Sequence, residues 1–127
     1  MLDVQKFAEE VLRNEPRVRY VGVLDNRLQV LVSEMREGVR SLTQSDEADR
    51  HWLQLVPNIL IECAEKLSPQ LGLVESVTIR YEKLFLVFFR LENLTIALSF
   101  EPTIVRPFMS TLSDLMQTLA SKYLKSD

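Results

Sequence analysis

The chain has 127 residues, 46% of them hydrophobic, and carries 15 basic against 18 acidic side chains for a net charge of −3. This length and composition fit one domain with its own core, so we expect residues 1–127 to fold as one unit. The slight acidity argues against a nucleic-acid partner, which usually meets a basic face. No apolar run approaches the ~20 residues that span a bilayer, so we expect a cytoplasmic protein without membrane insertion.

The first element is a predicted helix over Asp3–Asn14. Apolar residues recur at helical spacing on one side of this segment and polar residues take the other side. Asp3 suits the N-cap position. Glu15 precedes Pro16, and because a residue before proline avoids helical backbone, the helix is expected to end there.

The next segment predicts a hairpin of two strands, Val18–Leu24 and Leu28–Val32. Asp25 and Asn26 lie between them, and both residue types tolerate the left-handed backbone of a tight turn. Leu31 breaks the apolar–polar alternation of the second strand. We therefore expect both sides of that strand to be covered.

A polar segment, Ser33–Asp49, is expected to be a surface connection. A long helix is predicted over Asp49–Leu67. Pro57 interrupts it, so the helix either kinks there or divides into two helices. Ser68-Pro69 and Gly72 are expected to mark its end. The single cysteine, in an apolar helical run at position 63, is expected to be buried as a small hydrophobic residue.

Three strands and a final helix complete the chain. The strands are predicted over Val77–Tyr81, Leu84–Leu91 and Leu94–Phe100, and the helix over Thr103–Leu124. The middle strand is apolar on both faces, which is typical of a central strand covered on both sides.

These elements predict an α/β fold of order α-β-β-α-β-β-β-α. Tight turns join most strands, so the five-stranded sheet should be mostly antiparallel. The first and last helices each carry one narrow apolar stripe and are expected to pack on one face of the sheet. The long middle helix then covers the other face, which makes a three-layer sandwich.

The apolar band of the middle helix is wider than a surface helix needs. One part of it is expected to face the sheet: Trp52, Val56, Ile59, Cys63 and Leu67. A flank beside this stripe is left over: Leu53, Leu60, Ile61 and Ala64. We expect a second protein chain to cover this flank; the alternative is that the polar segment Ser33–Asp49 folds over it.

No catalytic chemistry stands out in the sequence. Its three glycines form no phosphate-binding loop, and one histidine and one cysteine do not supply a structural zinc site. We therefore expect no cofactor, no catalytic residue and no enzymatic activity.

The order and length of the elements resemble the roadblock family, the dynein light chain and GTPase-regulator family. The matching segments are Asp3–Asn14, Tyr20–Val32, Asp49–Leu67, Val77–Phe100 and Thr103–Leu124. The resemblance implies a roadblock/profilin-like fold and a homodimer that pairs edge strands and sets its long helices side by side. It also implies a small Ras-like GTPase as partner, or a scaffold role.

If a GTPase docks, the candidate contacts are charged residues around the start of the middle helix: Arg36, Arg40, Arg50 and His51, with Glu47 and Asp49 among them. Exposed charges of this kind steer encounter and specificity. The alternative function is a small-molecule sensor that binds a ligand between helix and sheet. Such a site needs a cavity with converging polar groups, whereas phenylalanines fill the inward positions, which favours the interaction module.

Overall fold

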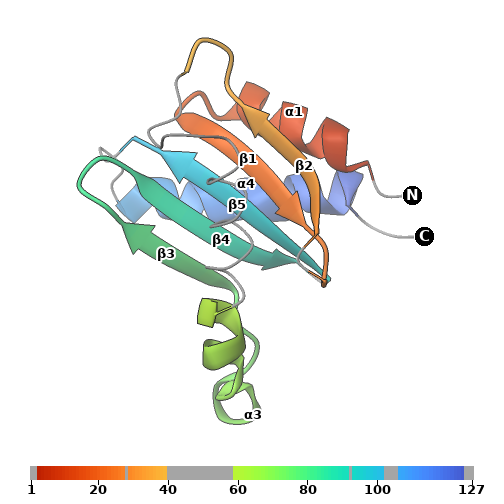
Figure 1. The fold of residues 1–127 in the computed structure, drawn as a ribbon, viewed down its shortest axis with the longest axis vertical. Helices are drawn as coiled ribbons and strands as arrows, with labels where there is room; N and C mark the ends of the chain where they lie inside the picture. Colours follow the sequence, from red (N-terminus) through yellow and green to blue (C-terminus); the bar gives the residue numbers. More distant parts are fainter. Residues whose placement is uncertain (1–2, 28, 40–58, 92, 102–105, 125–127) are drawn as a thin grey trace.

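In this computed structural model the described residues are 3–27, 29–39, 59–91, 93–101 and 106–124. Pro57 and most of the polar segment Ser33–Asp49 lie outside these ranges. The elements follow one another in the predicted order, α-β-β-α-β-β-β-α (Figure 1). The fold class is therefore confirmed.

The five strands form one antiparallel sheet of order β2-β1-β5-β4-β3. Their bounds are β1 Val18–Leu24, β2 Val30–Met35, β3 Ser76–Arg80, β4 Phe85–Leu91 and β5 Leu94–Phe100. The first and last strands in the sequence, β1 and β5, pair in the centre. This pairing leaves β2 and β3 as the two edges of the sheet.

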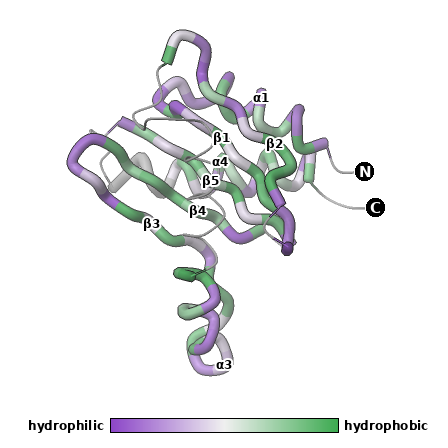
Figure 2. The backbone as a smooth tube through the Cα atoms, in the orientation of Figure 1, coloured by the Kyte–Doolittle hydropathy of each residue, from purple (hydrophilic) through white to green (hydrophobic). Residues whose placement is uncertain are grey.

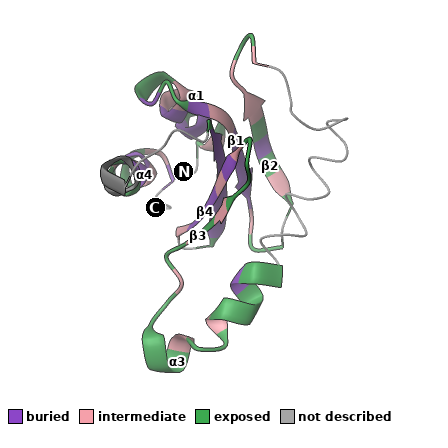
Figure 3. Cartoon of the chain, turned by 90° about the vertical axis from the view of Figure 1, so that its left-hand side faces the viewer, coloured by how far each residue is buried: buried purple, intermediate pink, exposed green. Residues whose placement is uncertain are grey.

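Two helices, α1 (Val4–Asn14) and α4 (Arg106–Tyr123), cover one face of the sheet (Figure 3), as predicted. The core between them and the sheet includes Phe7, Val11, Val21, Val87, Ile96, Leu98, Leu112 and Met116. The predicted N-cap is also confirmed, since the Asp3 Oδ1 accepts a hydrogen bond from the Lys6 N–H at 3.0 Å. The Asp3 N–H donates to the Tyr123 carbonyl oxygen at 2.9 Å, which joins the start of α1 to the end of α4.

The strand β4, which lies inside the sheet between β5 and β3, is apolar on both faces, as expected. Phe85, Val87 and Phe89 join the core under α1 and α4. Phe88 instead forms a second buried cluster on the opposite face, together with Leu24 and Ala97. We call the side of the sheet that carries this cluster the second face.

The described part of the middle helix lies at the end of the sheet. Residues 59–65 are helical, and a short helix α3, Ser68–Leu71, follows (Figures 1 and 3). The middle helix ends before Ser68-Pro69, as predicted, and these two residues begin a new helix, because proline is tolerated in the first turn of one. The stop comes at Gly72, whose φ of 87° is the left-handed backbone that glycine adopts most easily.

The strand β2 corrects two further expectations. It runs to Met35, so Ser33–Met35 is strand and not a surface connection. Val32 pairs with Val23 while Val30 pairs with Leu24, which leaves Leu31 as the extra residue of a β-bulge. The bulge sends Val30 and Val32 to opposite faces. Leu31 itself is 42% exposed, so the expectation that both sides of this strand are covered was wrong.

Candidate interaction surface

Residues 59–67, which comprise the helix 59–65 and the turn after it, expose apolar side chains to solvent (Figure 3). We call the helical patch the set Ile59, Leu60, Cys63, Ala64 and Leu67. At about 100° per residue, these five positions occupy one continuous arc of about 140° on the helix. The hydropathy-coloured tube shows apolar positions alternating with polar ones along this segment (Figure 2). The prediction that the cysteine is buried was wrong, because it lies in the middle of this arc.

The opposite side of the same helix faces the protein. Ile61 is only 3% exposed. The carboxylate of Glu65 lies 3.6 Å from the guanidinium of Arg90 on β4. Ile61 was predicted to lie on the outward flank and Ile59 to face the sheet, and the structure reverses the two. Hydropathy could not fix the rotation of this helix, since apolar residues occupy both sides of it.

Further apolar exposure follows the helical patch along the chain. Leu71 and Leu73 are 77% and 85% exposed, and both lie before the chain enters β3. The helical patch ends at Leu67, and β3, an edge strand of the sheet, begins at Ser76. Only a short segment therefore separates the helical patch from this edge.

The backbone of β3 has a regular hydrogen-bond pattern. The Arg90 N–H donates to the Glu75 carbonyl oxygen, and the Tyr81 N–H donates to the Leu84 carbonyl oxygen. In an antiparallel ladder such hydrogen-bonded pairs alternate with pairs whose backbone groups point outward. The register of β3 on β4 is unbroken from Ser76 to Arg80.

It follows that alternate residues of β3 direct their N–H and C=O groups away from the sheet: Ser76, Thr78 and Arg80. Within the described part of the chain no strand pairs on that side. The strand contains no proline and no bulge, two usual devices that block pairing at an edge, and its one charged residue, Arg80, stands at its end. We call this the open β3 edge.

The β2 edge is different, because a bulge interrupts it and side-chain contacts tie it to α1. Besides the bulge, the side chain of Gln5 on α1 donates from Nε2 to the Glu34 Oε1 at 2.9 Å. On the second face, the hydroxyl groups of Tyr20 and Ser33 lie 2.8 Å apart. The tyrosine ring passes over Gly22, where an added Cβ would lie 2.7 Å from the Tyr20 hydroxyl oxygen.

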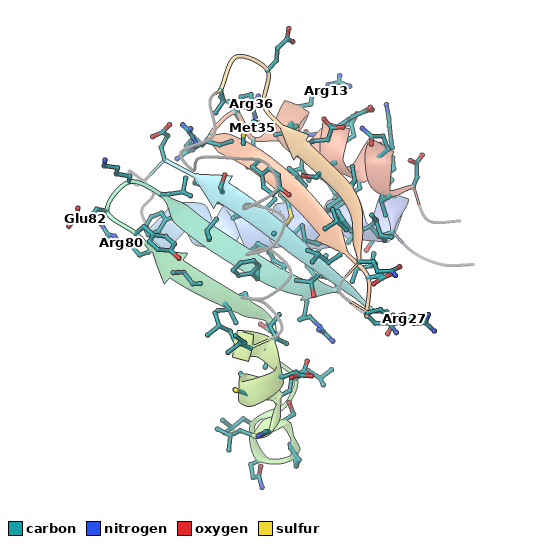
Figure 4. All side chains as sticks on the ribbon, viewed as in Figure 1. Arg13, Arg27, Met35, Arg36, Arg80 and Glu82 are labelled. Atoms are coloured by element: carbon teal, nitrogen blue, oxygen red, sulfur yellow. The ribbon has the colours of Figure 1, made fainter. Side chains whose placement is uncertain are left out.

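Arg36 follows β2 directly and ties it to α1 (Figure 4). Its Nε donates to the Val18 carbonyl oxygen at 2.7 Å. Its Nη2 donates to the carbonyl oxygens of Leu12 and Glu15 at 2.6 and 2.9 Å. A cation is favourable at these carbonyls, since the C-terminal end of a helix carries partial negative charge. Arg36 was predicted as a GTPase contact, but its guanidinium holds the fold together.

The comparisons with known proteins identify the architecture. By sequence, the chain matches no family model and no curated protein. Its structure is similar to a Roadblock/LC7 domain from Streptomyces avermitilis, with a TM-score of 0.71, 13% identity, and coverage of 98% of this chain and 99% of that one. The chain has the roadblock fold. This confirms the resemblance inferred from the order of the elements.

Two further roadblock-fold structures are similar over most of their length. The gliding protein MglB from Thermus thermophilus aligns with a TM-score of 0.66 and 17% identity, over 93% of this chain and 88% of that one. A structure described as MglB with a tetrameric arrangement gives 0.70 and 18%, over 94% and 86%. At these identities the likeness establishes the roadblock fold.

The predicted site residues divide into two groups within this roadblock fold. Leu60 and Ala64 lie together in the helical patch, whereas Ile61 and Arg36 serve the interior. The others lie outside the described residues: Arg40, Arg50, His51 and Leu53. A sheet edge was predicted to take part in the dimer, but the sequence analysis did not say which edge, although the absence of proline in Ser76–Arg80 was a signal for β3.

The described residues of this roadblock fold contain no group of three or more histidine, cysteine, aspartate or glutamate residues that could hold a metal ion. Of their helices, none is both long and apolar enough to cross a bilayer.

Proposed function

We propose that this chain is a non-enzymatic, cytoplasmic interaction module that forms a homodimer and binds a small Ras-like GTPase as regulator or scaffold. The observation that carries the dimer is the helical patch beside the open β3 edge. An exposed apolar surface and a row of unpaired backbone groups are each unusual at a solvated surface. Here they are consecutive in the chain.

A second copy of the chain can cover the helical patch and pair with the open β3 edge at the same time. A two-fold axis brings the same surface of each copy together, so an open edge meets an open edge. If two β3 strands pair antiparallel about Thr78, Ser76 of one copy lies opposite Arg80 of the partner subunit. Like charges then do not meet across the pair. A protein of the same fold with a tetrameric arrangement supports self-association as a use of this architecture.

The GTPase is proposed from the roadblock resemblance. Arg40, Arg50 and His51 remain the proposed contacts, and Arg36 no longer does because its Nε and Nη2 donate to carbonyl oxygens within the chain. We propose that the dimer binds and orients the switch regions of the GTPase and supplies no catalytic base.

Light scattering after gel filtration tests the dimer. We expect about twice the 14.7 kDa mass of one chain at micromolar concentration. Leu60→Glu should give a monomer with an unchanged circular dichroism spectrum, because this side chain is exposed in the single chain. Leu31→Glu is the matched control, since Leu31 has similar exposure on the β2 edge, and it should remain dimeric. A wild-type mass near that of one chain would contradict the dimer.

Affinity capture tests the GTPase. Wild-type protein and Leu60→Glu are immobilised in parallel and exposed to host lysate loaded with either GDP or a non-hydrolysable GTP analogue. Mass spectrometry should identify a small Ras-like GTPase that is retained by the wild type in one nucleotide state more than in the other. Finding no GTPase in either state, together with a small molecule bound to the purified protein, would favour the sensor function instead.

A further inference from the structure

Three side chains of the edge strand β3 are exposed on the side of the sheet that carries α1 and α4. They are Ser76, Thr78 and Arg80, which we call the polar row. Each lies opposite a residue of β4 that is buried in the core under those helices: Phe89, Val87 and Phe85. Side chains of paired residues project from the same side of a sheet. The covered part of this face therefore reaches β4, while the side chains of β3 are left exposed.

An aromatic ring holds the arginine of the polar row in place. The guanidinium carbon of Arg80 lies over the Phe85 ring, 5.1 Å from its centre. Within the described part of the chain Arg80 makes no ion pair. The acidic residue nearest to it in the sequence, Glu82, is exposed in the next turn beside Lys83, so this turn adds no net charge (Figure 4). A guanidinium that is oriented by a ring and has no acidic partner is well suited to bind a carboxylate.

The rest of the polar row offers hydroxyl groups in line with Arg80. At about 3.3 Å per residue, the row from Ser76 to Arg80 is about 13 Å long, which matches about four residues of an extended chain. Serine and threonine hydroxyls can donate to a carboxylate or to a backbone carbonyl oxygen. The apolar residues of β3, Val77 and Ile79, pack on the second face instead. The polar row therefore suits a negatively charged segment and not an apolar one.

We propose that the polar row binds an acidic, extended segment of another protein, with a carboxylate on Arg80 and polar groups on the hydroxyls of Thr78 and Ser76. The site does not depend on the proposed homodimer. Edge strands pair through backbone groups in the plane of the sheet, whereas the polar row projects out of that plane. A second copy at the β3 edge would leave the polar row exposed and place another one beside it.

Fluorescence anisotropy with a defined acidic probe tests the site. The probe is a short fluorescein-labelled peptide of alternating glutamate and serine, because an extended backbone places all its glutamates on one side. A peptide of alternating lysine and serine is the control probe. We expect saturable binding of the acidic peptide alone, although the chain as a whole carries a net charge of −3 and repels it. Arg80→Ala should weaken this binding about 10-fold or more, and Arg80→Lys should weaken it less, since lysine keeps the charge but loses the planar donors.

A second exposed arginine supplies the matched control. Arg27 lies in the turn between β1 and β2 and makes no ion pair among the described residues (Figure 4), so Arg27→Ala should bind the acidic peptide as the wild type does. Ser76→Ala/Thr78→Val should weaken binding about 3-fold, since it removes the hydroxyls and keeps the arginine. Absence of saturable binding to the wild type up to about 1 mM peptide, or an equal loss in Arg27→Ala, would overturn the site.

Light scattering of the same samples separates this inference from the proposed function. The substituted side chains are exposed, so circular dichroism and mass should not change in any of these variants. Peptide binding by a monomeric wild type would contradict the homodimer alone, and a dimer that does not bind the peptide would overturn the polar row alone. Inorganic phosphate should displace the labelled peptide far less effectively than unlabelled peptide does. Equal displacement would indicate a site for small anions and overturn a protein segment as the partner.

Discussion

The two edges of the sheet are treated in opposite ways by one chain. At the β2 edge, a bulge at Leu31 interrupts the strand and Arg36 fastens its end to α1. At the β3 edge, the register is unbroken from Ser76 to Arg80 and no described strand covers the outward backbone groups. Figure 4 shows Arg36 and Arg80 on these opposite edges.

This difference indicates which edge is kept for association. An uninterrupted, uncovered strand is a template for any other strand, so proteins normally block it. This chain uses three hydrogen bonds of one arginine at the β2 edge. The β3 edge instead adjoins the exposed helical patch.

The largest effect is expected from opening the β2 edge with Arg36→Ala. The substitution leaves three carbonyl oxygens without their charged donor, at a cost of about 2–4 kcal/mol in the free energy of unfolding. Urea denaturation measures this loss. Arg36→Lys retains the charge but lacks the planar guanidinium, so its free energy of unfolding should lie between those of the wild type and Arg36→Ala. A loss below about 0.5 kcal/mol would show that the arginine does not close this edge.

The next largest effect is expected at the open β3 edge, where a substitution should weaken dimerisation. Thr78→Pro removes an outward N–H and leaves the β3–β4 ladder intact, so the dimer should weaken about 10- to 100-fold. Met35→Pro is the matched control, since the alternation on β2 also directs its N–H outward. It should leave the dimer unchanged. If both prolines weaken the dimer equally in analytical ultracentrifugation, the two edges do not differ as proposed.

A smaller effect is expected at the tyrosine over Gly22. Gly22→Ala pushes its new Cβ into the Tyr20 side chain and disturbs the contact with Ser33, which should cost about 1–2 kcal/mol of stability. In a Tyr20→Ala background the same substitution should cost much less. A double-mutant cycle by denaturation measures the coupling, and additive effects would rule out the clash as the cause.

The smallest effect is expected from the exposed hydrogen bond between α1 and β2. Glu34→Ala removes the acceptor of Gln5 but leaves Arg36 in place, and should change the free energy of unfolding by less than about 0.5 kcal/mol. Denaturation of this variant beside Arg36→Ala compares the two contacts directly. A loss above about 1 kcal/mol would show that the Gln5–Glu34 hydrogen bond, and not Arg36, is the main contact that holds the β2 edge.

The sequence predicted the parts of the fold that depend on the regular spacing of apolar residues along strands and helices. That β4 is apolar on both faces follows from strict alternation, and the structure confirms it with Phe85 on one face and Phe88 on the other. The stripe of α1 and its cap at Asp3 follow from helical spacing and local hydrogen-bond chemistry. Such signals lie within a few residues of each other and need no knowledge of the tertiary structure.

The candidate site was less predictable because it depends on distant contacts. The carbonyl oxygens that hold Arg36 come from residues 18 to 24 positions earlier in the chain. No local pattern distinguishes such an arginine from a solvated one. The sequence also did not show which side of the middle helix faces the protein. Ile59 and Ile61 are equally apolar, and only the position of the sheet selects between them.

The hydrogen bond between Asp3 and Tyr123 has a practical consequence. It holds the beginning of α1 next to the end of α4, at the right of the sheet in Figure 1, whereas the helix that carries the helical patch lies below β3. Fluorescent proteins fused to the two ends of one chain would therefore sit close enough for energy transfer within a single molecule. The same fusions would leave the β3 edge accessible, so tagged copies can report on assembly in living cells.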